Sequence, residues 1–140
     1  MVGILLITHN GLGDTLIDCV RHVLGVAPAH LKALSVLADD DPLQKEQEAR
    51  ALIAQLDRGR GVLLLSDMFG ATPCNIARRL CVPGRIEGVA GVNLPMLLRV
   101  ACYNNKPLDE LVQRAVDGGK DCIMTMESEG CDAATGCTDN

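Results

Sequence analysis

Aromatic side chains are nearly absent from this sequence of 140 residues, which contains one Tyr, one Phe and no Trp. Proteins that bind RNA or single-stranded DNA commonly stack bases on aromatic side chains. Tyr103 and Phe69 alone do not provide such a platform. The net charge of −5 is also opposite in sign to that of proteins that bind a phosphate backbone. We therefore expect no nucleic acid among the partners.

Long hydrophobic runs are also absent. Runs such as Ile4–Ile7 and Val62–Leu65 are far shorter than the roughly 20 residues that span a bilayer. No basic segment and cleavage site follow Met1, so we expect no signal peptide and a cytoplasmic location. The 7 cysteines are odd in number and form no CxxC pair. We expect them to be reduced and to pack mostly as small apolar residues.

The composition predicts one folded domain. Apolar residues make up 48% of the chain and charged residues 22%, which excludes general disorder. We place the domain at residues 1–126. Residues 127–140 contain acids, Gly, Ser and Thr but no base, and we expect them to form a flexible acidic tail.

Apolar runs alternate with helical periodicity along the domain. Strands are predicted at residues 2–8, 31–37, 62–66 and 85–91, with a possible short fifth strand at Cys122–Met126. Helices are predicted to begin near Leu12, Pro42, Thr72, Leu94 and Pro107, the last ending at Gly118-Gly119. This alternation predicts an α/β fold with a single open, mainly parallel four-stranded sheet and helices on both faces. The two most apolar strands should be central, giving the order 2-1-3-4.

Two polar residues follow the two central strands directly. His9 comes after the first strand and Asp67 after the third. In open α/β sheets, ligand sites form beyond the carboxyl ends of the strands, where the strand order reverses. The sequence therefore predicts that His9 and Asp67 meet in one crevice.

The residues around His9 favour chemistry on a phosphoryl group. A neutral imidazole is a nucleophile near neutral pH, and Asp67 is placed to orient it. Thr72 can donate a hydrogen bond to the His9 ring or to a phosphoryl oxygen. Backbone N–H groups near a helix start favour an anion, and the segments concerned contain Asn10, Gly11, Gly70 and Ala71. The alternative is structural: His9 and Asp67 as loop caps, and Thr72-Pro73 as a helix start.

Other candidate site residues have simpler explanations. His22 is predicted to lie on a helix surface, and His30 to have a structural role before the second strand. Asp39-Asp40-Asp41 precedes Pro42, so capping and solvation explain these acids better than a metal. Cys131 and Cys137 lack the spacing of a zinc site, and neither GxGxxG nor a P-loop occurs. We expect no metal and no cofactor.

Three segments together resemble the IIA domain of the mannose-type bacterial sugar phosphotransferase system. They read Gly3-Ile-Leu-Leu-Ile-Thr-His9-Asn-Gly11, Val62-Leu-Leu-Leu-Ser-Asp67-Met-Phe-Gly70-Ala-Thr72-Pro73-Cys-Asn75 and Gly91-Val-Asn93-Leu-Pro95-Met96-Leu97. The resemblance runs from Val2 to about Met126. It implies the parallel α/β fold and a homodimer in which the strand at Cys122–Met126 crosses to the partner's sheet.

The resemblance also implies a reaction. His9 would accept a phosphoryl group from the phosphocarrier protein HPr and pass it to a histidine of a IIB domain or protein, which serves a membrane sugar permease. Asp67 and Thr72 would assist. Two alternatives use the same residues: a regulatory protein that signals by its phosphorylation state, and the phosphoryl-donor subunit of a dihydroxyacetone kinase. A flavodoxin-like ligand binder is a different class, disfavoured because few aromatics are present to stack on a flavin.

Two positions depart from the family's pattern, and one aromatic lies close to them. Asn10 and Ala71 stand where relatives commonly have Gly; Asn tolerates unusual backbone angles, whereas Ala71 would be strained at a positive φ. Phe69 lies between Asp67 and Thr72. It can either be exposed for docking of a partner protein or pack beneath its own loop.

Overall fold

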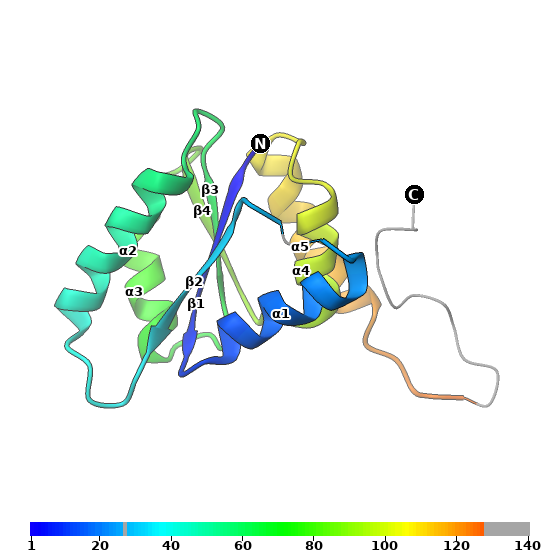
Figure 1. The fold of residues 1–140 in the computed structure, drawn as a ribbon, viewed down its shortest axis with the longest axis horizontal. Helices are drawn as coiled ribbons and strands as arrows, with labels where there is room; N and C mark the ends of the chain where they lie inside the picture. The colour runs from blue at the N-terminus through cyan, green and yellow to red at the C-terminus, as the bar shows by residue number, and fades with distance from the viewer. Residues whose placement is uncertain (27, 128–140) are drawn as a thin grey trace.

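A parallel sheet of four strands forms the centre of the computed structural model, which describes residues 1–26 and 28–127 (Figure 1). The strands are β1 (Gly3–His9), β2 (Leu31–Val36), β3 (Val62–Ser66) and β4 (Ile86–Ala90). Their order is β2-β1-β3-β4, with parallel pairing throughout. The predicted fold class and the strand order 2-1-3-4 are confirmed.

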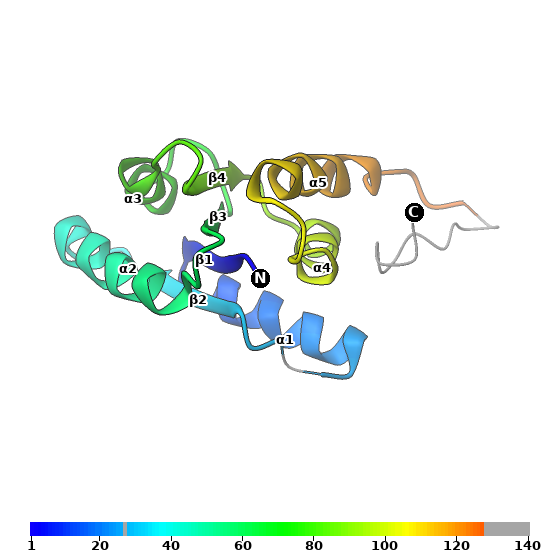
Figure 2. The ribbon, with the colours of Figure 1, turned by 90° about the horizontal axis from the view of Figure 1, so that it is seen from above.

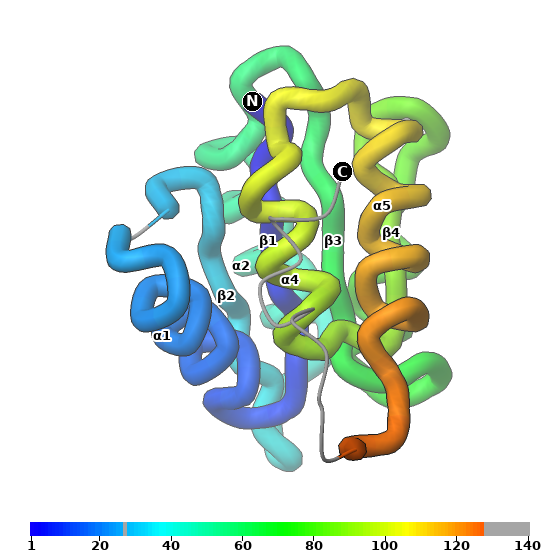
Figure 3. Tube along the Cα trace, turned by 90° about the vertical axis from the view of Figure 1, so that its right-hand side faces the viewer, coloured from blue at the N-terminus to red at the C-terminus, as the bar shows by residue number. Residues whose placement is uncertain are grey.

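Five helices of the described chain cover both faces of this sheet. They are α1 (Leu12–Leu24), α2 (Pro42–Leu56), α3 (Thr72–Leu80), α4 (Leu94–Cys102) and α5 (Leu108–Asp121). Figure 2 shows α2 and α3 on one side of the strands and α1, α4 and α5 on the other. Figure 3 looks at the sheet from the side of α4 and α5. In the described part, no helix is long and apolar enough to cross a bilayer.

The central strands contribute to two aliphatic cores. Along β1, Ile4 and Leu6 pack in the core beneath α1, α4 and α5, while Leu5 and Ile7 pack in the core beneath α2 and α3. All four are fully buried. Their continuous apolar run therefore reflects burial on both faces. The predicted strand burial is confirmed.

Polar side chains define the starts of two helices. Asp41 Oδ1 accepts the Leu43 N–H at 3.1 Å, which confirms it as the cap of α2. Asn93 Oδ1 accepts the Met96 N–H at 3.0 Å at the start of α4. The Asn93 side chain also donates to the Gly119 carbonyl at 3.1 Å. This side chain therefore links the start of α4 to α5.

The prediction that Gly118-Gly119 ends the last helix is wrong. Helix α5 continues through both glycines to Asp121. A Cβ atom at Gly118 would lie 3.0 Å from the Cβ of Arg99, and one at Gly119 would lie 2.9 Å from Cε of Met96. The two glycines thus allow α5 to approach α4 closely, instead of terminating the helix.

The predicted strand at Cys122–Met126 does not form within this single chain. Residues 123–127 follow α5 without regular secondary structure. Exchange of a strand requires a second chain, so the dimer stays a prediction. The proposed tail at 127–140 lies outside the described residues, apart from Glu127.

We predict that Gly3→Ala destabilises the fold. The added Cβ would lie 2.7 Å from Leu56 Cβ and 2.8 Å from the Leu56 carbonyl oxygen, and backbone cannot move aside cheaply. Urea denaturation should show a loss of about 1–3 kcal/mol in unfolding free energy. Gly11→Ala is the control, because Gly11 has a negative φ and nothing within 4 Å of an added Cβ. An equal loss in both variants would contradict this packing.

Candidate functional site

His9 and Asp67 meet at the carboxyl ends of the two central strands. Strand β1 ends at His9, and its neighbour β3 ends one residue before Asp67. The register pairs Ile7 with Ser66, so the two chain segments leave the sheet side by side. In Figure 1 this is the lower edge of the sheet, where α1 and α3 also begin. The predicted meeting of the two residues is present in the structure.

One carboxylate oxygen of Asp67 holds both the ring and the backbone of His9. Asp67 Oδ2 lies 2.8 Å from His9 Nδ1 and accepts the His9 backbone N–H at 3.0 Å. A carboxylate can only accept hydrogen bonds, so the ring proton lies on Nδ1 and the lone pair of Nε2 is available. The His9 side chain is 45% exposed and that of Asp67 11%. The ring is therefore fixed on one edge and accessible on another.

Burial and hydrogen bonding act in opposite directions on Asp67. Burial is the largest single influence and raises the pKa of its carboxyl group. The hydrogen bonds from the His9 ring and backbone, together with the charge of His9, outweigh burial, so that the pKa is lowered from its usual value. Asp67 is thus ionised at neutral pH and can balance positive charge on the His9 ring.

The loop after His9 turns sharply into α1. Asn10 has a φ of 49°, the left-handed region that Asn tolerates without being Gly. Its backbone N–H donates to the Val36 carbonyl at 3.0 Å, so that N–H is not available to a phosphoryl group. Thr8 is buried, and its Oγ1 accepts the Gly13 N–H at 2.9 Å. This contact fixes the start of α1 beside His9.

The second loop passes from Asp67 to α3. Gly70 has a φ of 89°, whereas Ala71 has an ordinary φ of −87°, so Ala71 carries no backbone strain. Asn75 closes the turn, since its side chain donates to the Gly70 carbonyl at 3.3 Å and its N–H to the Ala71 carbonyl at 2.9 Å. Thr72 is exposed, and its hydroxyl makes no hydrogen bond to His9 or to any other residue described.

Phe69 is exposed beside the site. Its exposed fraction is 71%, and that of the adjacent Met68 is 56%. The Arg78 guanidinium carbon lies 5.3 Å from the Phe69 ring centroid, a cation–π contact. Of the two alternatives for Phe69, the structure supports exposure over packing beneath the loop.

Two residues near the site were missed from the sequence. Thr8 positions the start of α1, as described above. The Ser66 carbonyl accepts the N–H groups of Gly91 and Val92 at 2.8 and 2.9 Å, which ties the loop after β4 to the end of β3. For Thr8 the available signal was a polar residue near the end of an otherwise apolar strand, whereas Ser66 acts through its backbone carbonyl, which no side-chain pattern reveals.

The remaining candidates lie apart from this pair or have other contacts. His22 is exposed on α1, as predicted. Asp40 Oδ2 accepts the Leu37 N–H at 2.7 Å and lies 3.6 Å from Lys45 Nζ. His30 precedes β2, at the opposite end of the sheet from His9. Across residues 1–26 and 28–127, no group of three or more His, Cys, Asp or Glu could hold a metal ion.

Comparison with known families identifies the domain. A family model described as "PTS system fructose IIA component" (EIIA-man) matches residues 3–116, a range that includes His9, Asp67 and Thr72. The chain belongs to the EIIA-man family. The matching model describes a IIA component of the phosphotransferase system (PTS).

Curated relatives of this EIIA-man chain are longer. It is 28% identical over 136 residues to the PTS system mannose-specific EIIAB component of Escherichia coli, covering 95% of this chain and 42% of that protein. The match to the protein of the same name from Shigella flexneri has the same values. The chain therefore spans about 42% of the length of these relatives.

Solved structures of IIA proteins share the fold. The mannose/sorbose-specific IIA subunit from Enterococcus faecalis has a TM-score of 0.81 and 23% identity, with 90% of this chain and 95% of that chain covered. The EIIA component from Streptococcus agalactiae has a TM-score of 0.80 and 18% identity, with coverage of 89% and 97%.

We predict that neutral His9 carries its proton on Nδ1. Long-range ¹⁵N–¹H spectra of the neutral ring should show this tautomer in the wild type. Asp67→Ala removes the acceptor and should give a mixture of both tautomers. Asp18→Ala is the control, since Asp18 pairs with Arg21 on the exposed face of α1. An unchanged His9 spectrum in Asp67→Ala would contradict the assignment.

Proposed function

We propose that this EIIA-man protein is a cytoplasmic phosphohistidine carrier. His9 accepts a phosphoryl group from HPr and passes it to a histidine of a IIB domain or protein. That IIB component in turn acts together with a membrane sugar permease. The observation that carries the proposal is the 2.8 Å contact between His9 Nδ1 and Asp67, which leaves the lone pair on Nε2 of a half-exposed side chain.

The transfer follows from this geometry. The lone pair of Nε2 forms a bond to phosphorus while the N–P bond of the donor phosphohistidine breaks, and the donor ring nitrogen keeps that electron pair. His9 then carries the phosphoryl group on Nε2 and a proton on Nδ1, so its ring is positively charged. Asp67, ionised because its pKa is lowered, balances that charge. The reverse displacement delivers the group to the acceptor.

The amino-terminal ends of α1 and α3 provide hydrogen-bond donors for the phosphoryl oxygens. Helices α1 and α3 begin just after the two site loops, and the first N–H groups of a helix lack intrahelical partners. Gly11, Gly70 and Ala71 belong to these loops, and the exposed Thr72 hydroxyl adds a donor. Asn10 contributes through its side chain, because its N–H is bound to Val36.

Partner proteins approach over the exposed loop beside His9. Met68 and Phe69 present apolar surface there, and exposed aromatics suit the centre of an interface. We assign HPr and the IIB acceptor to this surface in turn, and we keep the homodimer with exchanged C-terminal strands as part of the proposal. A regulatory role or donation to a dihydroxyacetone kinase would use the same phosphorylated His9 and differ only in the partner.

Labelling identifies the acceptor histidine. With phosphoenolpyruvate, enzyme I and HPr, the wild type should acquire acid-labile phosphate, and His9→Ala should acquire none because the nucleophile is missing. His22→Gln is the matched control, since His22 is exposed on α1. An unlabelled wild type, or equal labelling of His9→Ala, would disprove the carrier function.

Asp67→Ala should slow transfer without unfolding the protein. The substitution removes the hydrogen bonds to the His9 ring and backbone, and the loss of the charge-assisted ring contact, roughly 1.5–3 kcal/mol, predicts labelling about ten- to a hundredfold slower. Rapid-quench labelling measures the rate, circular dichroism checks the fold, and Asp18→Ala is the control. Normal transfer kinetics in Asp67→Ala would remove Asp67 from the mechanism.

A further inference from the structure

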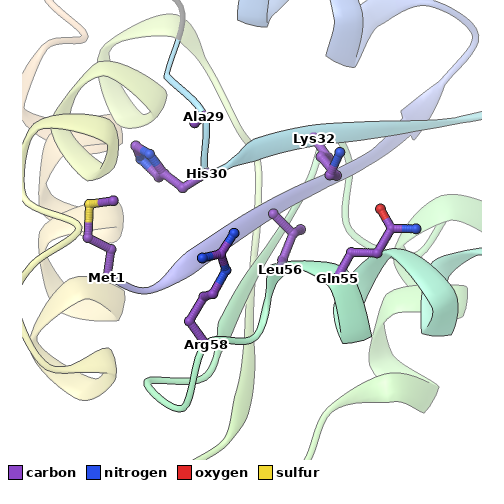
Figure 4. Close-up of a pocket in the computed structure, with 7 residues that line it drawn as sticks. All are labelled: Met1, Ala29, His30, Lys32, Gln55, Leu56 and Arg58. Carbon is purple, nitrogen blue, oxygen red and sulfur yellow. The ribbon is translucent and has the colours of Figure 1, made fainter.

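A cavity of about 560 Å³ lies at the amino ends of the strands, away from His9. Its lining comes from the segments just before β1 and β2, from β2 itself, from the end of α2 and from the loop that follows: Met1, Ala29, His30, Lys32, Gln55, Leu56 and Arg58. Figure 4 shows Lys32 on β2, Gln55 and Leu56 at the end of α2, and Arg58 just beyond it. Its volume is within the range of small-molecule sites.

The cavity is positively charged in a protein whose net charge is −5. Its lining contains Lys32 and Arg58 but no carboxylate. Neither cation forms an ion pair within residues 1–26 and 28–127. The nearby Asp57 is occupied elsewhere, because its Oδ1 accepts the N–H groups of Gly59 and Gly61. Two unpaired cations therefore face one cavity.

Lys32 interrupts a row of core residues. On β2, Leu34 and Val36 pack in the core beneath α2 and α3, and the alternation of the strand puts Lys32 on that same face. The core ends there with the buried Leu56. An apolar residue would extend the core at this point, whereas the lysine places an ammonium group at its edge, in the cavity.

His30 is a partly buried residue in the lining of the cavity. Burial is the main influence that lowers its pKa, and the positive amino terminus lowers it further. Its Nε2 is buried without a hydrogen-bond partner among the residues described. The Nε2 atom is therefore shielded from solvent, and His30 forms part of the cavity wall without contacting a ligand through this atom.

We propose that this cavity binds a small organic phosphate, a phosphate monoester. Lys32 and Arg58 neutralise the phosphate group, since ammonium and guanidinium groups are the usual protein partners of phosphate. Leu56, Ala29 and Met1 supply apolar contact for the organic part, and the Gln55 amide can bond its hydroxyl groups. The site is separate from His9, so both can be occupied at once.

The test is a titration of the ¹⁵N-labelled full chain with glycerol 3-phosphate at constant ionic strength. We expect saturable shifts of amide signals around residues 30–32 and 55–58. Lys32→Gln and Arg58→Gln should each weaken binding about tenfold, the effect of one charge-assisted contact. The same spectra report whether each variant is folded.

Three controls make the outcome decisive. Arg60→Gln removes an exposed arginine two positions from Arg58 that does not line the cavity, and should bind normally. His9→Gln should also bind normally, which separates this site from the phosphoryl carrier. Inorganic phosphate should bind more weakly than the ester because it lacks the glycerol part, whose hydroxyl groups bond Gln55 and whose carbon atoms contact Leu56. Unsaturable shifts, equal loss in Arg58→Gln and Arg60→Gln, shifts centred on His9, or equal affinity for inorganic phosphate would overturn the proposal.

Discussion

The contact between Asp67 and His9 depends on β1 and β3 lying side by side. Parallel pairing brings the ends of both strands to one edge, and a single carboxylate oxygen then holds the ring and the backbone of His9. This contact determines which ring nitrogen carries the proton. It also fixes the loop after β1 to the loop after β3. The reactivity we assign to Nε2 follows from this arrangement.

Polar functional groups lie at the ends of the strands, outside the aliphatic cores that cover both faces of the sheet. Residues such as Leu5 and Leu64 are fully buried between two helical layers, so polar groups gather at the ends of the strands. At the carboxyl ends, Thr8 and Ser66 hold neighbouring loops in place around His9. At the amino ends, Lys32 and Arg58 line a cavity. The carboxyl end of the sheet thus presents a histidine and a carboxylate, and the amino end presents two cationic side chains.

The scarcity of aromatics has a structural counterpart. The cores consist mainly of Leu, Ile, Val and Ala, with Tyr103 partly buried at the edge of one of them. Phe69 lies outside both cores, exposed beside the site. Close packing of aliphatic side chains is therefore sufficient for this fold, and the remaining aromatic is available to contact a partner.

Local sequence was enough to predict the strands, most helix starts and the pair His9 and Asp67. Apolar runs and the strand-order rule depend on neighbouring residues and general chain geometry. Tertiary packing decided the rest. Gly118-Gly119 reads as a helix end, but close contact with α4 keeps these residues helical. The tautomer of His9, the strain-free Ala71, the exposed Phe69 and the unbonded Thr72 hydroxyl depend on residues distant in sequence or on loop geometry. No local pattern encodes the relative positions of those groups.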